Sequence, residues 1–245
     1  ADLVRSLRLI DKLRESEDVP SFLFEPRHGG PLADFVPGQH LPLELEIPGI
    51  AGSLRRTYSL SNAPGEGRYR ISVKRQPQGL ASRFLHDKLE PGAIVSSRAP
   101  AGDFVPGCSD CPLVLVSAGI GVTPMMSILR SVAEQGDDRP VWFVHGARDG
   151  RHHPLAEEAR VLAAGRSNIR LHVAYSRPGP EDVEGSDYDS RGRVDGDLLA
   201  GLVGTADAQY FLCGPTGFMA AVRADLEKAG VAAERIHTET FGPAA

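Results

Sequence analysis

Several absences in the sequence narrow the possible functions. There are only three cysteines among 245 residues, too few for a disulfide framework or for the four-cysteine set of an iron–sulfur cluster. No run approaches the roughly 18 consecutive apolar residues of a membrane span. No cluster of Lys and Arg offers a footprint for a nucleic-acid backbone. We therefore expect a soluble, cytoplasmic protein that binds neither nucleic acid nor membrane and has no metal site.

The remaining composition is that of a folded globular protein. Hydrophobic residues make up 41% and charged residues 24%, so two domains of modest size could each bury a core. The first residue is Ala1 rather than methionine. The sequence leaves open whether this chain is part of a longer polypeptide, and it leaves the oligomeric state open as well.

Residues 1–107 are predicted to form an antiparallel β domain. Apolar runs in this half are short, and Pro-Gly pairs interrupt them at near-regular intervals, beginning at Pro37, Pro48, Pro64 and Pro91. This spacing of turns favours a small closed barrel with hairpin and Greek-key connections. One helix is expected, over residues 81–89.

Residues 108–245 have a different pattern and are predicted to form an α/β domain. Continuous apolar runs, typical of strands buried on both faces, occur at 113–117, 141–145, 169–175, 209–213 and 235–240. Longer amphipathic stretches at 124–135, 154–164, 195–202 and 216–229 separate them. Strands that alternate with helices indicate a doubly wound parallel sheet. We place the domain boundary between residues 107 and 108, in a polar segment rich in Pro and Gly.

Two strand ends in the second half could bind a dinucleotide. Gly119 and Gly121 follow the first buried strand, with Thr123 as the expected N-cap and Pro124 as the first residue of the next helix. Such a turn lets backbone amides approach a pyrophosphate, although a tight turn without a ligand has the same residues. Cys213-Gly214-Pro215 ends another strand, where the cysteine could equally be a small core residue.

Two motifs in the first half could bind a planar ligand that carries phosphate. Arg56-Thr57-Tyr58-Ser59 lies on a predicted strand and combines a guanidinium, an aromatic ring and hydroxyls. Gly79-Leu80-Ala81-Ser82 precedes the predicted helix and offers an anion site at its start.

In this order the motifs resemble those of the ferredoxin-NADP reductase superfamily. Arg56 to Ser59 is similar to its flavin motif, Gly79 to Ser82 to its pyrophosphate turn, and the tail Glu239-Thr240-Phe241-Gly242-Pro243 to its carboxy-terminal signature. The likeness is greatest to the reductase module of flavohaemoglobins and of multidomain reductases with a MOSC or ferredoxin domain. It implies a six-stranded barrel that binds FAD, with FMN as the alternative, and an α/β domain that binds NADH or NADPH.

The resemblance also implies roles for individual residues. Tyr58 would pack on the isoalloxazine, Arg56 would meet the flavin phosphates and Ser59 would hydrogen-bond near flavin N5. Further contacts with the flavin would come from Thr57, Val73, Lys74, Gly79, Leu80, Ala81, Ser82 and Phe241. Cys213 would lie near the nicotinamide C4, and Glu239 would border the flavin, which makes Ser59, Cys213 and Glu239 the expected catalytic residues. The coenzyme would contact Gly119, Gly121, Thr123, Pro124, Ser176, Arg177, Gly214 and Pro215.

The implied activity is that of a flavin-dependent NAD(P)H oxidoreductase. It would pass electrons singly to an iron–sulfur or haem partner, such as a plant-type ferredoxin or a globin. A non-catalytic flavin-binding sensor and a self-contained NAD(P)H:flavin or quinone reductase are the alternatives. Arg177 could accept the 2′-phosphate of NADPH, whereas the acidic run 181–189 would repel it, so the choice of coenzyme stays open. We interpret Cys108-x-x-Cys111 as incidental and place His152-His153 in a solvated loop.

Overall fold

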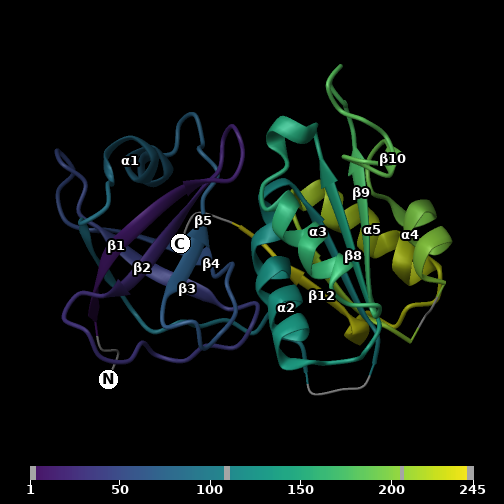
Figure 1. Ribbon diagram of the computed structural model, residues 1–245, viewed down its shortest axis with the longest axis horizontal. Helices are drawn as coiled ribbons and strands as arrows, with labels where there is room; N and C mark the ends of the chain where they lie inside the picture. Colours follow the sequence, from purple (N-terminus) through teal and green to yellow (C-terminus); the bar gives the residue numbers. More distant parts are fainter. Residues whose placement is uncertain (1–3, 108–110, 205–206, 242–245) are drawn as a thin grey trace.

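A computed structural model describes residues 4–107, 111–204 and 207–241. Three predictions concern residues outside these ranges. They are the domain boundary between residues 107 and 108, the interpretation of Cys108, and the tail residues Gly242 and Pro243. In Figure 1 an antiparallel β half lies beside an α/β half. Among the described residues, no helix has both the length and the apolar character needed to cross a membrane.

The first half is a six-stranded antiparallel sheet closed into a barrel. Its strands are β1 (Arg5–Arg14), β2 (Pro20–Pro26), β3 (His40–Leu45), β4 (Leu54–Ser59), β5 (Tyr69–Ser72) and β6 (Ile94–Ser97), in the order β4-β3-β6-β1-β2-β5. A bridge between Leu60 and Ile71 joins the two edge strands, so the sheet closes on itself. Helix α1 (Leu80–Lys88) follows β5 and packs Leu85 into the barrel core.

The second half is a six-stranded parallel sheet with helices on both faces. Its strands are β7 (Leu113–Ala118), β8 (Val141–Ala147), β9 (Ile169–Tyr175), β10 (Ser190–Arg191), β11 (Gln209–Cys213) and β12 (Ile236–Glu239), in the order β10-β9-β8-β7-β11-β12. Helices α2 (Val122–Gln135) and α3 (Ala156–Ala164) cover one face. Helices α4 (Gly196–Val203) and α5 (Thr216–Lys228) cover the other. The predicted barrel and doubly wound sheet are both confirmed.

Two local predictions are wrong. Helix α2 does not start at Pro124 with Thr123 as its N-cap, because the 3₁₀ turn η1 (Gly119–Gly121) leads directly into a helix that begins at Val122. The Thr123 hydroxyl instead donates to the carbonyl of Ile120, 3.1 Å away.

His153 is not in a solvated loop. It follows the 3₁₀ turn η2 (Gly150–His152) and is 4% exposed. Its ring stacks on His145, with 4.9 Å between the ring centroids, and its Nδ1 lies 2.9 Å from the Tyr175 hydroxyl. The prediction failed because the burial of this histidine depends on contacts from β8 and β9, which sequence spacing does not reveal.

Ion pairs and hydrogen bonds join the two halves. Arg70 of β5 pairs with Glu158 of α3 at 2.8 Å, and Arg130 of α2 pairs with Glu158 at 2.6 Å and with Glu66 at 2.9 Å. The Ser127 hydroxyl of α2 donates to a carbonyl in the loop after β4, 2.8 Å away. These contacts set the position of the α/β half relative to the barrel.

Candidate functional site

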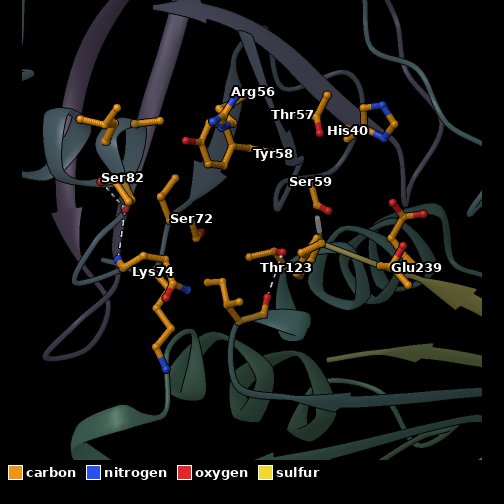
Figure 2. A pocket seen from close by; sticks show the side chains of 18 residues that line it. His40, Arg56, Thr57, Tyr58, Ser59, Ser72, Lys74, Ser82, Thr123 and Glu239 are labelled. Atoms are coloured by element: carbon orange, nitrogen blue, oxygen red, sulfur yellow. Dashed lines mark hydrogen bonds between the residues drawn. The ribbon is translucent and has the colours of Figure 1, made fainter. Parts of the chain in front are cut away.

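A cavity of about 390 Å³, here called the barrel cavity, lies where the barrel meets the second half. It brings together residues from β4, β5, α1, η1, α2 and β12 (Figure 2). The predicted site residues that line it are Arg56, Thr57, Tyr58, Ser59, Val73, Lys74, Gly79, Leu80, Ala81, Ser82, Thr123, Glu239 and Phe241. Its volume lies in the range of about 300–1,000 Å³ that is usual for cofactor and ligand pockets.

Strand β4 supplies an aromatic ring and a hydroxyl to this cavity. Burial raises the pKa of Tyr58 to about 12, although the charge of Arg56 opposes the shift, so its hydroxyl stays protonated and neutral. Ser59 is 6% exposed, and its hydroxyl has no hydrogen-bond partner among the described residues. The strand therefore offers the cavity a flat apolar face and an uncommitted donor.

The start of α1 forms an anion site on another wall. Gly79 is the N-cap and provides no side-chain cap, so the first amides of the helix have no partner within the described part of the chain. The Ser82 hydroxyl fixes the turn, accepting from the Gln76 amide at 3.1 Å and donating to the Gly79 carbonyl at 3.3 Å. Unpaired amides at a positive helix end bind phosphate.

Strand β12 closes the cavity from the second half. Burial, followed by the charge of Asp103, raises the pKa of Glu239 above its ordinary value. Phe241, two residues further on, is 46% exposed and presents an aromatic ring. Burial lowers the pKa of His40, which lies on the same side of the cavity as Glu239 in Figure 2.

A second cavity of about 760 Å³, here called the sheet-end cavity, runs along the carboxyl ends of the parallel strands. Of the predicted residues, Gly119, Ser176 and Pro215 line it, and Lys74 lines both cavities. Gly119 has a φ of +56° with open space beside its α-carbon, so its backbone faces the cavity without a side chain in the way.

Five predicted residues line neither cavity: Gly121, Pro124, Arg177, Cys213 and Gly214. A Cβ on Gly121 would lie 2.1 Å from the carbonyl oxygen of Cys213, so this glycine permits the two strand-end loops to touch. Cys213 is fully buried, and burial followed by the charge of Glu239 raises the pKa of its thiol far above the ordinary value. Its thiol is therefore neutral. The predicted roles of these five residues stay predictions.

Sequence reasoning missed several residues that line the cavities. Those in the barrel cavity are His40, Ser72, Gln76, Ile120 and Thr240, and those in the sheet-end cavity include Asp18, Arg148, His152, Arg193, Asp195 and Phe218. Ile120 and Thr240 lie inside motifs that the sequence analysis had already identified, so their position in the sequence could have predicted them as lining residues. Ser72 directly precedes the predicted Val73 on the chain. The remaining residues lie outside the motifs, and only the tertiary fold brings them to the cavities.

The residues of the barrel cavity fit a flavin dinucleotide. Such a group needs an aromatic surface for its ring, hydrogen-bond donors at the ring edge and an anion site for its diphosphate. Tyr58, the free Ser59 hydroxyl and the uncapped start of α1 supply these three features on adjoining walls.

Comparison with known proteins agrees with this fit. Residues 6–105 match the family model described as an oxidoreductase FAD-binding domain, and residues 115–224 match the oxidoreductase NAD-binding domain. The FAD/NAD-binding domain of nitric oxide dioxygenase from Vibrio cholerae O1 biovar El Tor is 36% identical with a TM-score of 0.89, over 99% of this chain and 100% of that one. The chain belongs to the ferredoxin reductase-like family of FAD- and NAD-binding oxidoreductase modules.

Other members of the family are longer than this chain. The flavohemoproteins of Deinococcus radiodurans and Bordetella pertussis are both 41% identical, over 98% and 97% of this chain but only 59% and 60% of their own length. The flavohemoglobin of Malassezia yamatoensis, solved with bound FAD and heme, is 27% identical with a TM-score of 0.86 over 98% of this chain and 60% of that one.

Membership of the ferredoxin reductase-like family confirms the predictions of family, FAD and nicotinamide coenzyme. The flavin that the matching family model names is FAD. The module spans about 60% of the flavohemoproteins that it matches.

Proposed function

We propose that this module takes hydride from NAD(P)H and passes electrons one at a time to a haem or iron–sulfur partner. The observation that carries the proposal is that the two cavities are neighbours, because Lys74 lines both. A dinucleotide in the sheet-end cavity can therefore extend toward the barrel cavity. Bound FAD would supply the chemistry, since a flavin accepts two electrons as hydride and releases them singly.

The protein's own part is binding and positioning, which for hydride transfer requires reacting atoms about 3–3.5 Å apart. We propose that Tyr58 fixes the plane of the ring, that the start of α1 binds the diphosphate and that Ser59 donates a hydrogen bond at the ring edge. Glu239 would border the ring from β12. Cys213, which is buried behind the loop at Gly121, would act by positioning that loop.

The partner is proposed to be a globin or a plant-type ferredoxin, in another domain or another protein. Support comes from relatives whose names join the same module to haem. We also propose a domain boundary between residues 107 and 108, which falls in the gap between the two family matches. A cytoplasmic location is proposed as well, supported by the small number of cysteines.

The decisive experiment is anaerobic addition of NADH or NADPH to the purified yellow protein. We expect the flavin absorbance to bleach, then to return when ferricyanide or cytochrome c is added. These acceptors should be reduced much faster than oxygen is consumed. A protein that binds flavin but does not bleach would be a sensor, and faster turnover with oxygen or an organic substrate would indicate a self-contained enzyme.

A further inference from the structure

We propose that this module prefers NADPH over NADH because Arg193, assisted by Arg148, binds the 2′-phosphate of the adenosine. The inference rests on the proposed function, since it assigns the sheet-end cavity to the coenzyme. Both arginines line that cavity. Neither belongs to a motif that the sequence marks.

The order of the strands decides which end of the cavity receives the adenosine. Strand β12, which carries Glu239 to the barrel cavity, is at one edge of the sheet, and β10 is at the other. A nicotinamide must approach the barrel cavity, so the adenosine half points toward β8, β9 and β10. Figure 1 shows β10 on the side of the sheet away from the barrel.

Arg193 stands at this far end. The Gly192 amide donates to the Tyr175 carbonyl at 2.9 Å, which puts the next residue beside Ser176 at the end of β9. Arg193 is exposed, and its guanidinium has no hydrogen bond or ion pair within residues 4–107, 111–204 and 207–241. An arginine on a cavity wall without a partner is well suited to bind a phosphate, because the guanidinium presents two parallel donors.

Arg148 is a second cation on the same wall, at the end of β8. Its Nε donates to Asp149 at 3.1 Å and one Nη lies 2.9 Å from His152 Nδ1. Its side chain is still 54% exposed. The pair with Asp149 orients the guanidinium, and the other Nη group makes no hydrogen bond or ion pair within the described part of the chain. Arg148 therefore assists Arg193 rather than replacing it.

The acidic residues nearby do not cancel this charge. None of the carboxylates in the run 181–189 lines the cavity. They fold their own loop instead: Asp182 accepts from the amides of Gly150 and Gly179, and Asp189 accepts from the amide of Val173. The repulsion expected from the sequence is therefore weakened, because these carboxylates lie outside the cavity.

Two carboxylates do line the cavity, and both have partners. Asp195 accepts from the Leu198 amide at 3.0 Å and caps α4. Asp18 is ion-paired with Lys74 at 3.3 Å. Arg193 is therefore a charged residue that lines the cavity and has no hydrogen bond or ion pair within the described part of the chain.

Calorimetry with adenosine fragments tests the proposal without turnover. The probes are 2′,5′-ADP and 5′-AMP, which differ only in the 2′-phosphate. We expect the FAD-loaded protein to bind 2′,5′-ADP about tenfold more tightly, as one charge-assisted contact in partly solvated surroundings would give. Arg193→Gln should bring the ratio of the two affinities close to one, and Arg148→Gln should lower it part of the way.

Two further arginines sharpen the test. Arg191→Gln is the matched control, because Arg191 pairs with Glu184 and does not line the cavity, so the ratio should persist. Arg177→Gln tests the residue that the sequence suggested. Equal affinities in the wild-type protein, or a ratio abolished by Arg177→Gln but not by Arg193→Gln, would overturn the assignment.

Anaerobic bleaching separates this inference from the proposed function. If NADH and NADPH reduce the flavin with equal dissociation constants, the preference is wrong while the oxidoreductase function stands. If neither coenzyme reduces the flavin and neither fragment binds, the function itself is wrong.

Discussion

At the scale of single residues, the uncommitted hydroxyl of Ser59 gives a direct test of the barrel cavity. Ser59→Ala should leave FAD bound and slow anaerobic reduction roughly two- to tenfold, because a neutral hydrogen bond contributes about 0.5–1.5 kcal/mol. Stopped-flow absorbance of the flavin measures the rate. The exposed Ser53 on the turn before β4 provides the control, and Ser53→Ala should reduce at the wild-type rate. If both variants behave alike, Ser59 does not contact the ring.

The buried pair His145 and His153 predicts a loss of stability in acid. Burial lowers the pKa of His145 to about 4 and lowers that of His153 well below its ordinary value. Between the unfolded pKa near 6.5 and the folded value, the unfolded chain binds more protons than the folded one. Stability therefore falls as the pH drops through this window, by about 3 kcal/mol for His145.

Urea unfolding from pH 7.5 to 4.5 measures this dependence. His145→Gln removes the titrating group, so its free energy of unfolding should change less with pH, whatever its value at neutral pH. The exposed His28 supplies the comparison, and His28→Gln should keep the wild-type slope. An unchanged slope in His145→Gln would show that other groups cause the acid sensitivity.

At the scale of elements, the contact between two strand-end loops depends on Gly121. An added Cβ would meet backbone atoms of Cys213 and Gly214, which cannot move aside as a side chain could. We expect Gly121→Ala to destabilise the protein by about 1–3 kcal/mol, as overpacking does elsewhere. Thermal unfolding measures the loss. Gly201→Ala, in α4 with nothing within 4 Å, should be neutral or slightly stabilising and is the matched control.

Most elements could be predicted because their cause is local. Strand β11 begins and ends where its apolar run does, since both of its faces are buried. Strand β9 also has the predicted bounds, although Arg170 within it is exposed. Helix α2 ends at Gln135 as predicted, because Gly136 adopts the left-handed conformation that stops a helix. The first residue of α2 could not be predicted, because the 3₁₀ turn η1 leads directly into the helix before the expected N-cap at Thr123.

The site was predictable where its residues form a continuous motif. Arg56 to Ser59 and Gly79 to Ser82 all reach one cavity because each segment is a single turn or strand. Arg193 and His153 could not be found in this way. Arg193 enters its cavity through the pairing of β10 with β9, and His153 is buried by β8 and β9, so both depend on contacts between distant segments.

At the scale of the whole molecule, the ion pairs between the halves predict coupled unfolding. Arg70 is 9% exposed, and its guanidinium depends on Glu158 of the other half. Glu158→Gln would leave this cation without a charged partner, at a loss of about 2 kcal/mol after allowance for partial exposure. We expect the wild-type protein to unfold in one thermal transition and Glu158→Gln to unfold in two.

Differential scanning calorimetry of the FAD-loaded protein measures this separation. The control is Glu157→Gln, which alters an exposed neighbour on the same helix and should keep one transition. Persistence of a single, unshifted transition in Glu158→Gln would mean that the apolar contacts alone couple the halves.

The contribution of β12 to the wall of the barrel cavity also has a consequence for biosynthesis. Some walls of the barrel cavity come from β4, β5 and α1, which are synthesised early. Others come from Glu239, Thr240 and Phe241, which are synthesised at the end of the last strand of the parallel sheet and directly after it. Domains generally fold in order as the chain leaves the ribosome. The barrel emerges with its cavity open on one side, and flavin capture is completed only after translation of the second half. A nascent chain stalled before β12 should therefore exchange its flavin freely.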